Sequence, residues 1–243
     1  MHTRRTLTLL TLLAAVPAAA QDTISAERPG FSSSPYALDE GRWQIEGGYR
    51  FTHARSSVDQ HTLPLALLRY GAGPRAEIRF SWPGIAWTDG PAGSVHGPTD
   101  ASIGVKWQLT DDAARTPVGV FAGLSLPVGD DAYSSDEVDP TLGLFWAHNG
   151  RIGLFGTALL SQSGSDTVFG NAVGVNLPLR GSRSAYVEYF GSWGENRGPE
   201  HTLDGGFIFL QSNDMQFDVH AGIGLNERAA DGFLGIGAAW RFR

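Results

Sequence analysis

The chain has 243 residues, of which 42% are hydrophobic, and its formal net charge is −7 at pH 7. An acidic chain is a poor partner for nucleic acid, whose phosphates attract basic surfaces. The chain contains no cysteine, so disulfides and thiolate chemistry are excluded. Its length suits one large domain, and its 32 glycines exceed the average share of roughly 7%.

The N-terminus has the pattern of a secretory signal peptide. Two arginines precede the apolar run 7–16, and residues 18–20 form an A-x-A cleavage signal. We therefore expect residues 1–20 to be removed, which leaves Gln21 first in the mature chain. A membrane anchor is the alternative, but the apolar run is shorter than the roughly 20 residues that a spanning helix needs. A bacterial lipid anchor is excluded because no cysteine follows the run.

Residues 21–41 form the next predicted unit and fit neither a strand nor a helix. The stretch 22–41 reads "DTISAERPGFSSSPYALDEG", in which two prolines and two glycines interrupt any regular element. We expect this unit either to extend into the periplasm or to fold into the following domain as a plug. In the second case Arg28, Phe31 and Tyr36 are the expected plug contacts.

From residue 42 onward the chain alternates polar and apolar residues, which is the period of a β-strand. The alternating segments are 42–52, 62–71, 75–82, 100–109, 117–127, 140–148, 151–161, 167–178, 184–191, 201–211, 215–226 and 232–242. Each is close to the roughly 9–11 residues that a tilted strand needs to cross a bilayer. No segment of comparable length has helical spacing.

The connections between these segments alternate in length. Those after odd-numbered segments tend to be long and polar, such as "PGIAWTDGPAGSVHGPT" and "VGDDAYSSDEVD", whereas those after even-numbered segments are short, such as "AGP" and "NG". One pair breaks the pattern, since "QSGSD" is shorter than "TDDAART". Outer-membrane barrels have long external loops and short periplasmic turns, and a soluble sandwich gives no reason for such alternation.

Aromatic side chains gather near one end of the segments. If the chain starts on the periplasmic side, five of them share the apolar face at that rim: Trp43, Tyr70, Trp107, Trp146 and Trp240. Amphipathic rings favour the membrane–water interface, so this is the pattern of an aromatic girdle. Tryptophans in the core of a sandwich would have no reason to gather at one end.

These patterns predict an all-β domain over residues 42–243, namely a transmembrane antiparallel β-barrel of about 12 strands in an up-and-down meander. Closure removes the unpaired strand edges, which a bilayer does not tolerate. In the last segment, Leu234 and Trp240 belong to the predicted lipid face and Arg241 to the lumen face. An aromatic residue at the C-terminus is the usual signal for the barrel-insertion machinery, an expected partner, but here one residue follows Phe242.

On this parity, charged side chains of both signs point into the lumen. They are Glu46, Arg50, Arg69, Glu77, Arg79, Asp100, Lys106, Glu188, Asp204, Asp218, His220 and Arg241. Buried charges must be paired or hydrated. They would form either a ladder of ion pairs that holds a narrow lumen together or a polar track for a permeating solute.

The same face carries aromatic side chains that an open aqueous pore does not need. They are Phe121, Phe145, Phe155, Tyr186, Phe190 and Phe233. These rings would either pack against a plug or line a path for an apolar or aromatic solute.

Signals for metal binding and catalysis are weak. The acidic connection 129–139 could hold a hard cation such as Ca²⁺, but it lacks the spacing of an EF-hand loop, so we expect a solvated loop and no metal. The sequence has no G-x-S-x-G, H-E-x-x-H or phosphate loop. His201 and Asp204 point to opposite faces, and no nucleophile accompanies Asp218 and His220. We therefore predict no enzyme and no cofactor.

Several stretches carry a family resemblance: "AERPGFSSSPYALDEGRWQIEGGYRF", "LLRYG", "ASIGVKWQL", "GLSLPVG", "AYVEYFG", "HTLDGGFIFL", "AGIGLNE" and "FLGIGAAWRF". In their order and spacing they resemble outer-membrane transporters of the MetA-pathway of phenol degradation family, over nearly the whole chain after the signal peptide. The resemblance implies a Gram-negative outer-membrane β-barrel with a role in uptake of aromatic or other apolar compounds. It supplies no defined binding residues.

Two functions remain at this point. The first is an outer-membrane channel, surrounded by membrane lipid, that passes small aromatic or hydrophobic compounds passively. The second is a closed structural barrel that acts as an anchor or scaffold. An outer-membrane enzyme and a soluble periplasmic or secreted β-protein are minor alternatives, and the sequence does not indicate the oligomeric state.

Overall fold

The structure is a computed structural model that describes residues 23–150, 152–196 and 198–243. These residues form strands, turns and irregular segments, without a helix. Accordingly, a helix able to cross a membrane is not found among them. The predicted signal peptide, residues 1–20, lies outside the described residues.

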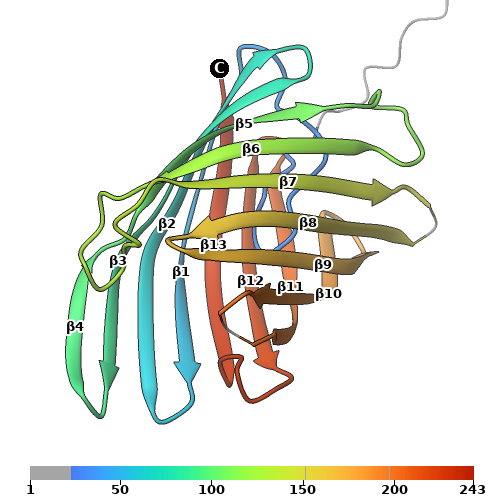
Figure 1. The fold of residues 1–243 in the computed structure, drawn as a ribbon. Coiled ribbons are helices and arrows are strands. Elements are labelled where there is room, and N and C mark those ends of the chain that lie inside the picture. Colours follow the sequence, from blue (N-terminus) through green and yellow to red (C-terminus); the bar gives the residue numbers. More distant parts are fainter. Residues whose placement is uncertain (1–22, 151, 197) are drawn as a thin grey trace, which may run out of the picture.

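Antiparallel strands follow one another around a barrel (Figure 1). Their bounds are β1 Trp43–Ala54, β2 Val58–Gly73, β3 Ala76–Gly90, β4 Gly93–Pro98, β5 Ala101–Gln108, β6 Val118–Leu126, β7 Asp139–His148, β8 Gly153–Ser163, β9 Asp166–Pro178, β10 Arg183–Gly194, β11 Glu200–Ser212, β12 Met215–Gly224 and β13 Gly232–Phe242. β1 pairs with both β2 and β13, which closes the sheet. β4 and β5 pair with opposite ends of β3, so the wall has 12 strand positions. The predicted closed antiparallel meander is confirmed.

The two faces of the wall differ as the alternation predicts. Leu234 and Trp240 on the outer face are 59% and 54% exposed, whereas Glu46 and Lys106 on the inner face are 1% and 0% exposed. Exposed apolar side chains outside and buried charges inside reverse the arrangement of a soluble protein. They suit a surrounding hydrocarbon layer, which accepts apolar side chains and no unpaired backbone groups.

The predicted aromatic girdle lies at the rim where β1 begins. Trp43 is opposite Tyr70 in the β1–β2 register, and their rings are 4.5 Å apart. Trp240 is near the end of β13 that pairs with the start of β1. Trp107 and Trp146 lie at the same rim, near the ends of β5 and β7.

The predicted alternation of long and short connections is wrong. The loops expected at 53–61 and 83–99 are mostly strand: β1 and β2 leave only residues 55–57 between them, and the end of β3 forms a hairpin with β4. The longest connections are 127–138 on one rim and 109–117 on the other. The polar stretches 53–61 and 83–99 continue as strands beyond the apolar belt because pairing with a neighbouring strand satisfies their backbone groups.

The wall is irregular where β1 meets β2. The register shifts between Glu46 and Arg50 of β1, and Leu65 of β2 has a φ of 47°. Gly84 of β3 lies beside this point with a φ of 108°, where a side chain would be strained. A Cβ at this position would also collide with the carbonyl of Leu63. An unequal number of residues on the two strands bends the wall here, as in a β-bulge.

Candidate solute path and its inner segment

Residues 23–42, which we call the inner segment, run inside the barrel before β1 begins. The segment is tied to the rim near both ends: the amide of Ile24 donates to the carbonyl of Asn213 at 2.7 Å, and that of Gly41 to Gly71 at 2.8 Å. Between these points its backbone is not paired with a strand. Buried backbone groups still need partners, and here wall side chains provide them.

Carboxylates of the wall accept hydrogen bonds from the amides of the inner segment. Glu46 of β1 accepts from the amides of residues 27 and 28, at 2.9 and 3.2 Å. Glu188 of β10 accepts from those of residues 31 and 32, at 2.6 and 2.9 Å. Glu77 of β3 accepts from the amide of Leu38 at 2.8 Å, and Gln108 of β5 from that of Ala37 at 3.0 Å. The segment is therefore fastened to strands on several sides of the barrel.

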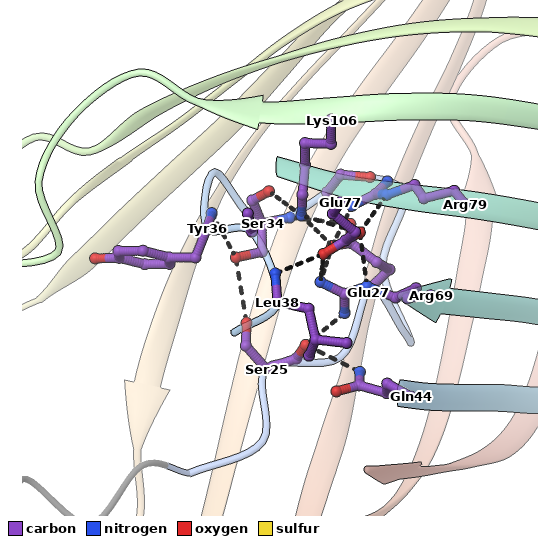
Figure 2. Close-up of polar contacts among 12 residues, drawn as sticks. Ser25, Glu27, Ser34, Tyr36, Leu38, Gln44, Arg69, Glu77, Arg79 and Lys106 are labelled. Carbon is purple, nitrogen blue, oxygen red and sulfur yellow. Dashed lines mark hydrogen bonds and ion pairs between the residues drawn. The ribbon is translucent and has the colours of Figure 1, made fainter. Parts of the chain in front are cut away.

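One side chain of the inner segment completes a buried ionic cluster (Figure 2). The carboxylate of Glu27 lies 2.6 Å from Arg79, 2.9 Å from Lys106 and 3.3 Å from Arg69. Glu77 binds Arg69 at 2.8 Å and Arg79 at 2.6 Å. All five side chains are at most 8% exposed. We call this group the Glu27 cluster.

The charges of this region balance only with the inner segment in place. The wall contributes the three cations of the Glu27 cluster. It also contributes two carboxylates, Glu77 and Glu46, the second of which lies 3.1 Å from Arg69. Glu27 supplies the third negative charge. Burial alone would raise the pKa of Glu27, but the nearby Arg79, Lys106 and Arg69 outweigh it and lower the pKa to about 2. Glu27 is therefore ionised at neutral pH.

The three predicted plug contacts all touch the wall. Arg28 donates to Asp218 of β12 at 3.2 Å and to the carbonyl of Ile236 of β13 at 3.1 Å. The ring of Phe31 stacks on that of Phe190, with centroids 4.7 Å apart and planes inclined by 6°. The hydroxyl of Tyr36 accepts from the side-chain amide Nδ2 of Asn149 at 2.9 Å.

Glycines make room for Arg28 at the seam between β1 and β13. A Cβ at Gly48 or Gly237 would collide with its guanidinium group. The arginine therefore lies directly on the backbone of the wall, which a larger residue at either position would prevent.

The inward aromatic residues form two groups. Phe121 and Phe145 lie beside Arg79, whose guanidinium carbon is 5.6 and 5.9 Å from their ring centres. This places them next to the Glu27 cluster. Phe155 of β8 and Tyr186 of β10 form the second group, with ring centres 6.5 Å apart.

Beside that second group lie the remaining predicted lumen residues of β10 to β13. The hydroxyl of Tyr186 donates to Asp204 at 2.7 Å. His220 meets the ring of Phe233 edge-on at 5.6 Å, and Arg50 lies 5.5 Å from the same ring. The sequence thus predicted residues that the fold brings together in two separate regions.

Two predicted lumen residues lie at the rims instead. Asp100 falls between β4 and β5, where it accepts from the amide of Gly129 at 2.9 Å and from the hydroxyl of Ser134 at 3.1 Å. Its carboxylate therefore holds part of the connection 127–138. Arg241 binds Asp214 at 2.8 Å at the opposite rim.

The inner segment lies between cavities. Toward the rim where β1 begins, one of about 480 Å³ is lined by residues that include Leu38 and Arg241, and one of about 270 Å³ lies between the segment and Phe155. Farther from this rim, a cavity of about 180 Å³ is lined by residues that include Arg28 and Arg50.

A separate hollow of about 770 Å³ lies in the wall at the irregular β1–β2 junction. Its lining combines lipid-facing residues such as Ile45 and Trp240 with the lumen-facing Glu46 and Asp218. Apolar atoms make up most of its surface. The hollow therefore brings the apolar outer face close to the lumen.

Sequence reasoning missed several residues that hold the inner segment. Gln44 and Gln108 share the inward parity of Glu46 and Lys106, and both are buried, so parity could have found them. Glu27 lies in a segment for which no regular structure was predicted, and its neighbour Arg28 was predicted as a plug contact in its place. The charge balance that requires it becomes visible only once the wall is closed.

Among the residues that the structure describes, no group of three or more His, Asp or Glu side chains could hold a metal ion. Acidic side chains of the connection 129–139 accept hydrogen bonds from other residues of the chain. Asp139 accepts from the hydroxyl of Ser135 at 2.6 Å and from the amide of Gly164 at 3.0 Å.

The solved structures similar to this chain include outer-membrane proteins. An outer-membrane channel from Pseudomonas putida F1 is 16% identical with a TM-score of 0.65, covering 88% of this chain and 99% of that one. The NanC porin is 11% identical with a TM-score of 0.57, covering 82% and 98%. The translocator domain of the autotransporter NalP from Neisseria meningitidis is 9% identical with a TM-score of 0.51, covering 84% and 90%. At such identities the likeness concerns the fold, which is that of Gram-negative outer-membrane barrels.

No curated protein sequence matches the chain. A family model does match, over residues 26–242, and its description is "Putative MetA-pathway of phenol degradation". The match includes most of the inner segment and the whole barrel wall. The chain therefore belongs to this family of outer-membrane β-barrels.

Proposed function

We propose that the protein is a passive outer-membrane channel for small aromatic or hydrophobic compounds, with the inner segment as its plug. One observation carries the proposal: a closed barrel encloses a segment held by side-chain contacts and not by strand pairing. When the segment leaves, water can hydrate the polar groups on both sides of these contacts. The plug can therefore leave its place while the wall keeps every strand pair.

Two features support an aromatic or hydrophobic solute. The lumen beside the inner segment carries aromatic rings, including Phe155 and Phe233. The wall hollow presents apolar surface close to the lumen. Sites for small molecules are mostly apolar with a few polar groups, and this lumen has both.

A closed structural barrel is the second candidate. The balanced Glu27 cluster favours it, because the wall charges match those of the segment when the lumen is occupied. The two candidates differ in one respect: a channel requires the segment to move, and a structural barrel does not.

Processing and assembly complete the proposal. Residues 1–20 act as an export signal, residues 21–41 as the plug and residues 42–243 as the barrel. The barrel-insertion machinery recognises the final strand, which ends at Phe242. The protein works by transport and not by catalysis.

The test compares wild-type protein with a variant that lacks residues 23–40, both in planar bilayers. We expect at least a tenfold rise in conductance on deletion. A third variant replaces the same residues with glycine and serine, which keeps the tether and removes the contacts, and it should conduct like the deletion. Faster migration of the unboiled protein on a denaturing gel confirms that each variant forms a barrel. Equal conductance of wild type and deletion would favour the structural barrel.

A further inference from the structure

Lys106 of β5 is a buried cation that donates hydrogen bonds to the inner segment (Figure 2). Its ammonium group donates to the carboxylate of Glu27 at 2.9 Å and to the carbonyl of Ser34 at 3.1 Å. The wall carboxylate of Glu77 is farther away, at 3.7 Å, and it already accepts from two arginines of the wall. The side chain of Lys106 is fully buried. Its charge is therefore matched by a carboxylate that does not belong to the wall.

A single oxygen of Glu27 makes the contacts with the three wall cations. Oε1 accepts from Arg79 at 2.6 Å and from Lys106 at 2.9 Å, and Arg69 lies 3.3 Å from the same oxygen. The other oxygen, Oε2, accepts from the amide of Ser34 within the segment, at 3.1 Å. The wall thus arranges three cations around the position of one carboxylate oxygen.

The wall around this position has an excess of one positive charge when the segment leaves. Its three cations then face two carboxylates, those of Glu46 and Glu77. Water can hydrate the cations but adds no negative charge, and a buried charge without a partner is costly. One monovalent anion at the place of the Glu27 carboxylate restores the balance, whereas a neutral solute does not.

An apolar surface adjoins the three cations. The guanidinium carbon of Arg79 is 5.6 and 5.9 Å from the ring centres of Phe121 and Phe145. A Cβ at Gly104 or Gly123 would collide with the ring of Phe121, so this ring lies against the backbone of β5 and β6. Phe121 is only half-buried. Its remaining surface can contact the apolar part of a solute whose charged end reaches Arg79.

Two cavities reach the position of Glu27. Glu27 lines one of about 270 Å³ together with Tyr36 and Phe155, and one of about 180 Å³ together with Arg28 and Arg50. A solute that moves from one of these cavities to the other passes the Glu27 side chain. The cations that surround its carboxylate therefore lie on a path through the lumen.

We propose that the three cations of the Glu27 cluster form a binding site for a small organic acid, whose carboxylate takes the place of that of Glu27. The inference rests on the proposed channel function, in which the inner segment moves, and adds the charge of the solute. The apolar body of the acid lies against Phe121. In the docked segment, Glu27 acts as an internal competitor for the site.

Competition at this site links binding of the acid to movement of the plug. Glu27 and the acid cannot occupy one position together, so the acid binds the released state and increases its share. Release of the segment by other means strengthens binding of the acid in turn. In the wild-type protein the apparent affinity is reduced, because only the molecules with a released segment bind.

Binding is measured on full-length protein in detergent by ¹⁹F NMR line broadening, with 4-fluorobenzoate and 4-fluorobenzamide as probes. The two probes have nearly the same shape and differ in charge. We expect saturable binding of 4-fluorobenzoate and at least tenfold weaker binding of 4-fluorobenzamide, since hydrogen bonds between charged groups are the stronger ones. Fluoroacetate, which has a carboxylate and no ring, should also bind more weakly than 4-fluorobenzoate. Equal binding of the benzoate and the benzamide would refute the site.

Lys106→Gln tests the cationic wall. It leaves the emptied site with two cations and two carboxylates, so it should weaken binding of 4-fluorobenzoate at least tenfold. Arg55→Gln removes the same charge from an exposed side chain and should bind like wild type. Faster migration of the unboiled protein on a denaturing gel confirms that both variants form a barrel. Equal weakening by both variants would mean that the net charge of the protein attracts the probe, and would contradict the proposal.

Glu27→Gln tests the competition and leaves the barrel wall unchanged. It should strengthen binding of 4-fluorobenzoate at least tenfold, because the competing charge is removed, and leave binding of 4-fluorobenzamide unchanged. Glu40→Gln changes an exposed carboxylate of the same segment and should affect neither probe. Stronger binding of both probes by Glu27→Gln would show that a loosened plug, and not a vacated anion position, is responsible, and would overturn the proposal.

Two further outcomes separate this inference from the channel itself. Flux of neutral solutes through liposomes without saturable binding of 4-fluorobenzoate would keep the channel and refute the site. Saturable binding of 4-fluorobenzoate that depends on residues 27 and 106, in a protein without flux, would keep the site and refute the channel.

Discussion

The inner segment meets two regions of the wall that differ in chemistry. At β1 to β5 it places Glu27 among three buried cations, each within 3.3 Å. At β10 to β13 it places the ring of Phe31 on that of Phe190, beside Asp204 and His220. The first region is held by matched charges, and the second by stacked rings.

The two regions differ in the cost of removing the inner segment from them. Removing a charge from a buried, balanced cluster leaves other charges unpaired, which is costly. Removing a ring from an aromatic wall leaves a surface that another ring can cover. The Glu27 cluster therefore keeps the segment in place, whereas the contact between Phe31 and Phe190 is lost at a lower cost.

Breaking the Glu27 cluster should have the largest effect. Glu27→Gln leaves three buried cations with two carboxylates, and breaking a buried ion pair typically costs about 3–5 kcal/mol. We expect conductance in planar bilayers to rise to that of the variant without the segment. Glu40→Gln, an exposed residue of the same segment, is the control and should conduct like wild type. Unchanged conductance of Glu27→Gln would show that charge does not hold the segment.

Disturbing the β1–β13 seam should have an intermediate effect. Gly237→Ala places a Cβ where the guanidinium of Arg28 lies, so Arg28 must leave Asp218. The loss of a hydrogen bond to a charged group should weaken docking of the segment by about 1.5–3 kcal/mol. Faster hydrogen exchange of the segment's amides would report it. Gly73→Ala, where a Cβ has space, should exchange like wild type; equal acceleration in both variants would contradict the assignment.

Removing a partly exposed hydrogen bond should have a small effect. Tyr36→Phe deletes the oxygen that accepts from Asn149, which is worth about 0.5–1.5 kcal/mol. The open probability in single-channel recordings should rise between about twofold and tenfold. A rise as large as that of Glu27→Gln would mean that the end of the segment near Tyr36, and not the Glu27 cluster, holds it.

The smallest effect should come from pH in the neutral range. The pKa of Glu27 is lowered from 4.5 to about 2, so its ionised contacts stabilise the docked segment fully above 4.5. That contribution is lost as the pH falls through the pKa of about 2. Conductance should therefore stay constant from about pH 7 to 5 and rise in stronger acid, unlike that of Glu27→Gln. A rise between pH 7 and 5 would show that another group controls the segment.

The strands of the wall and their inward-facing residues could be predicted from the sequence, because alternation is a local property of strands. The inward parity of Glu46, Lys106 and His220 followed from their neighbours, and all three are buried in the closed barrel. The lengths of the connections could not be predicted. Polar residues beyond the apolar belt, such as those of β4, become strand only because a neighbouring strand extends alongside them.

The inner segment could not be placed from sequence because its partners are distant. Glu27 binds Arg79 and Lys106, which lie 52 and 79 positions away along the chain. No local period marks such a contact. Arg28, Phe31 and Tyr36 were expected as contacts only if the segment folds into the barrel. The charge balance that favours this position involves side chains that come together only in the closed barrel.

The central claim is that the inner segment closes the lumen and must move for solutes to pass. Because the chain has no cysteine, an introduced pair of thiols can test it directly. The amide of Ser33 lies 3.2 Å from the hydroxyl of Thr157 on β8, so Ser33→Cys with Thr157→Cys places one thiol on each side of this contact.

The measurement is solute flux through liposomes that contain the double variant, before and after reduction. The plug predicts flux at the level of empty liposomes while the disulfide is formed, and recovery to the wild-type rate once it is reduced. Either single variant should respond to neither condition. Equal flux in the oxidised and reduced states would contradict the plug and leave the inner segment a fixed part of the barrel.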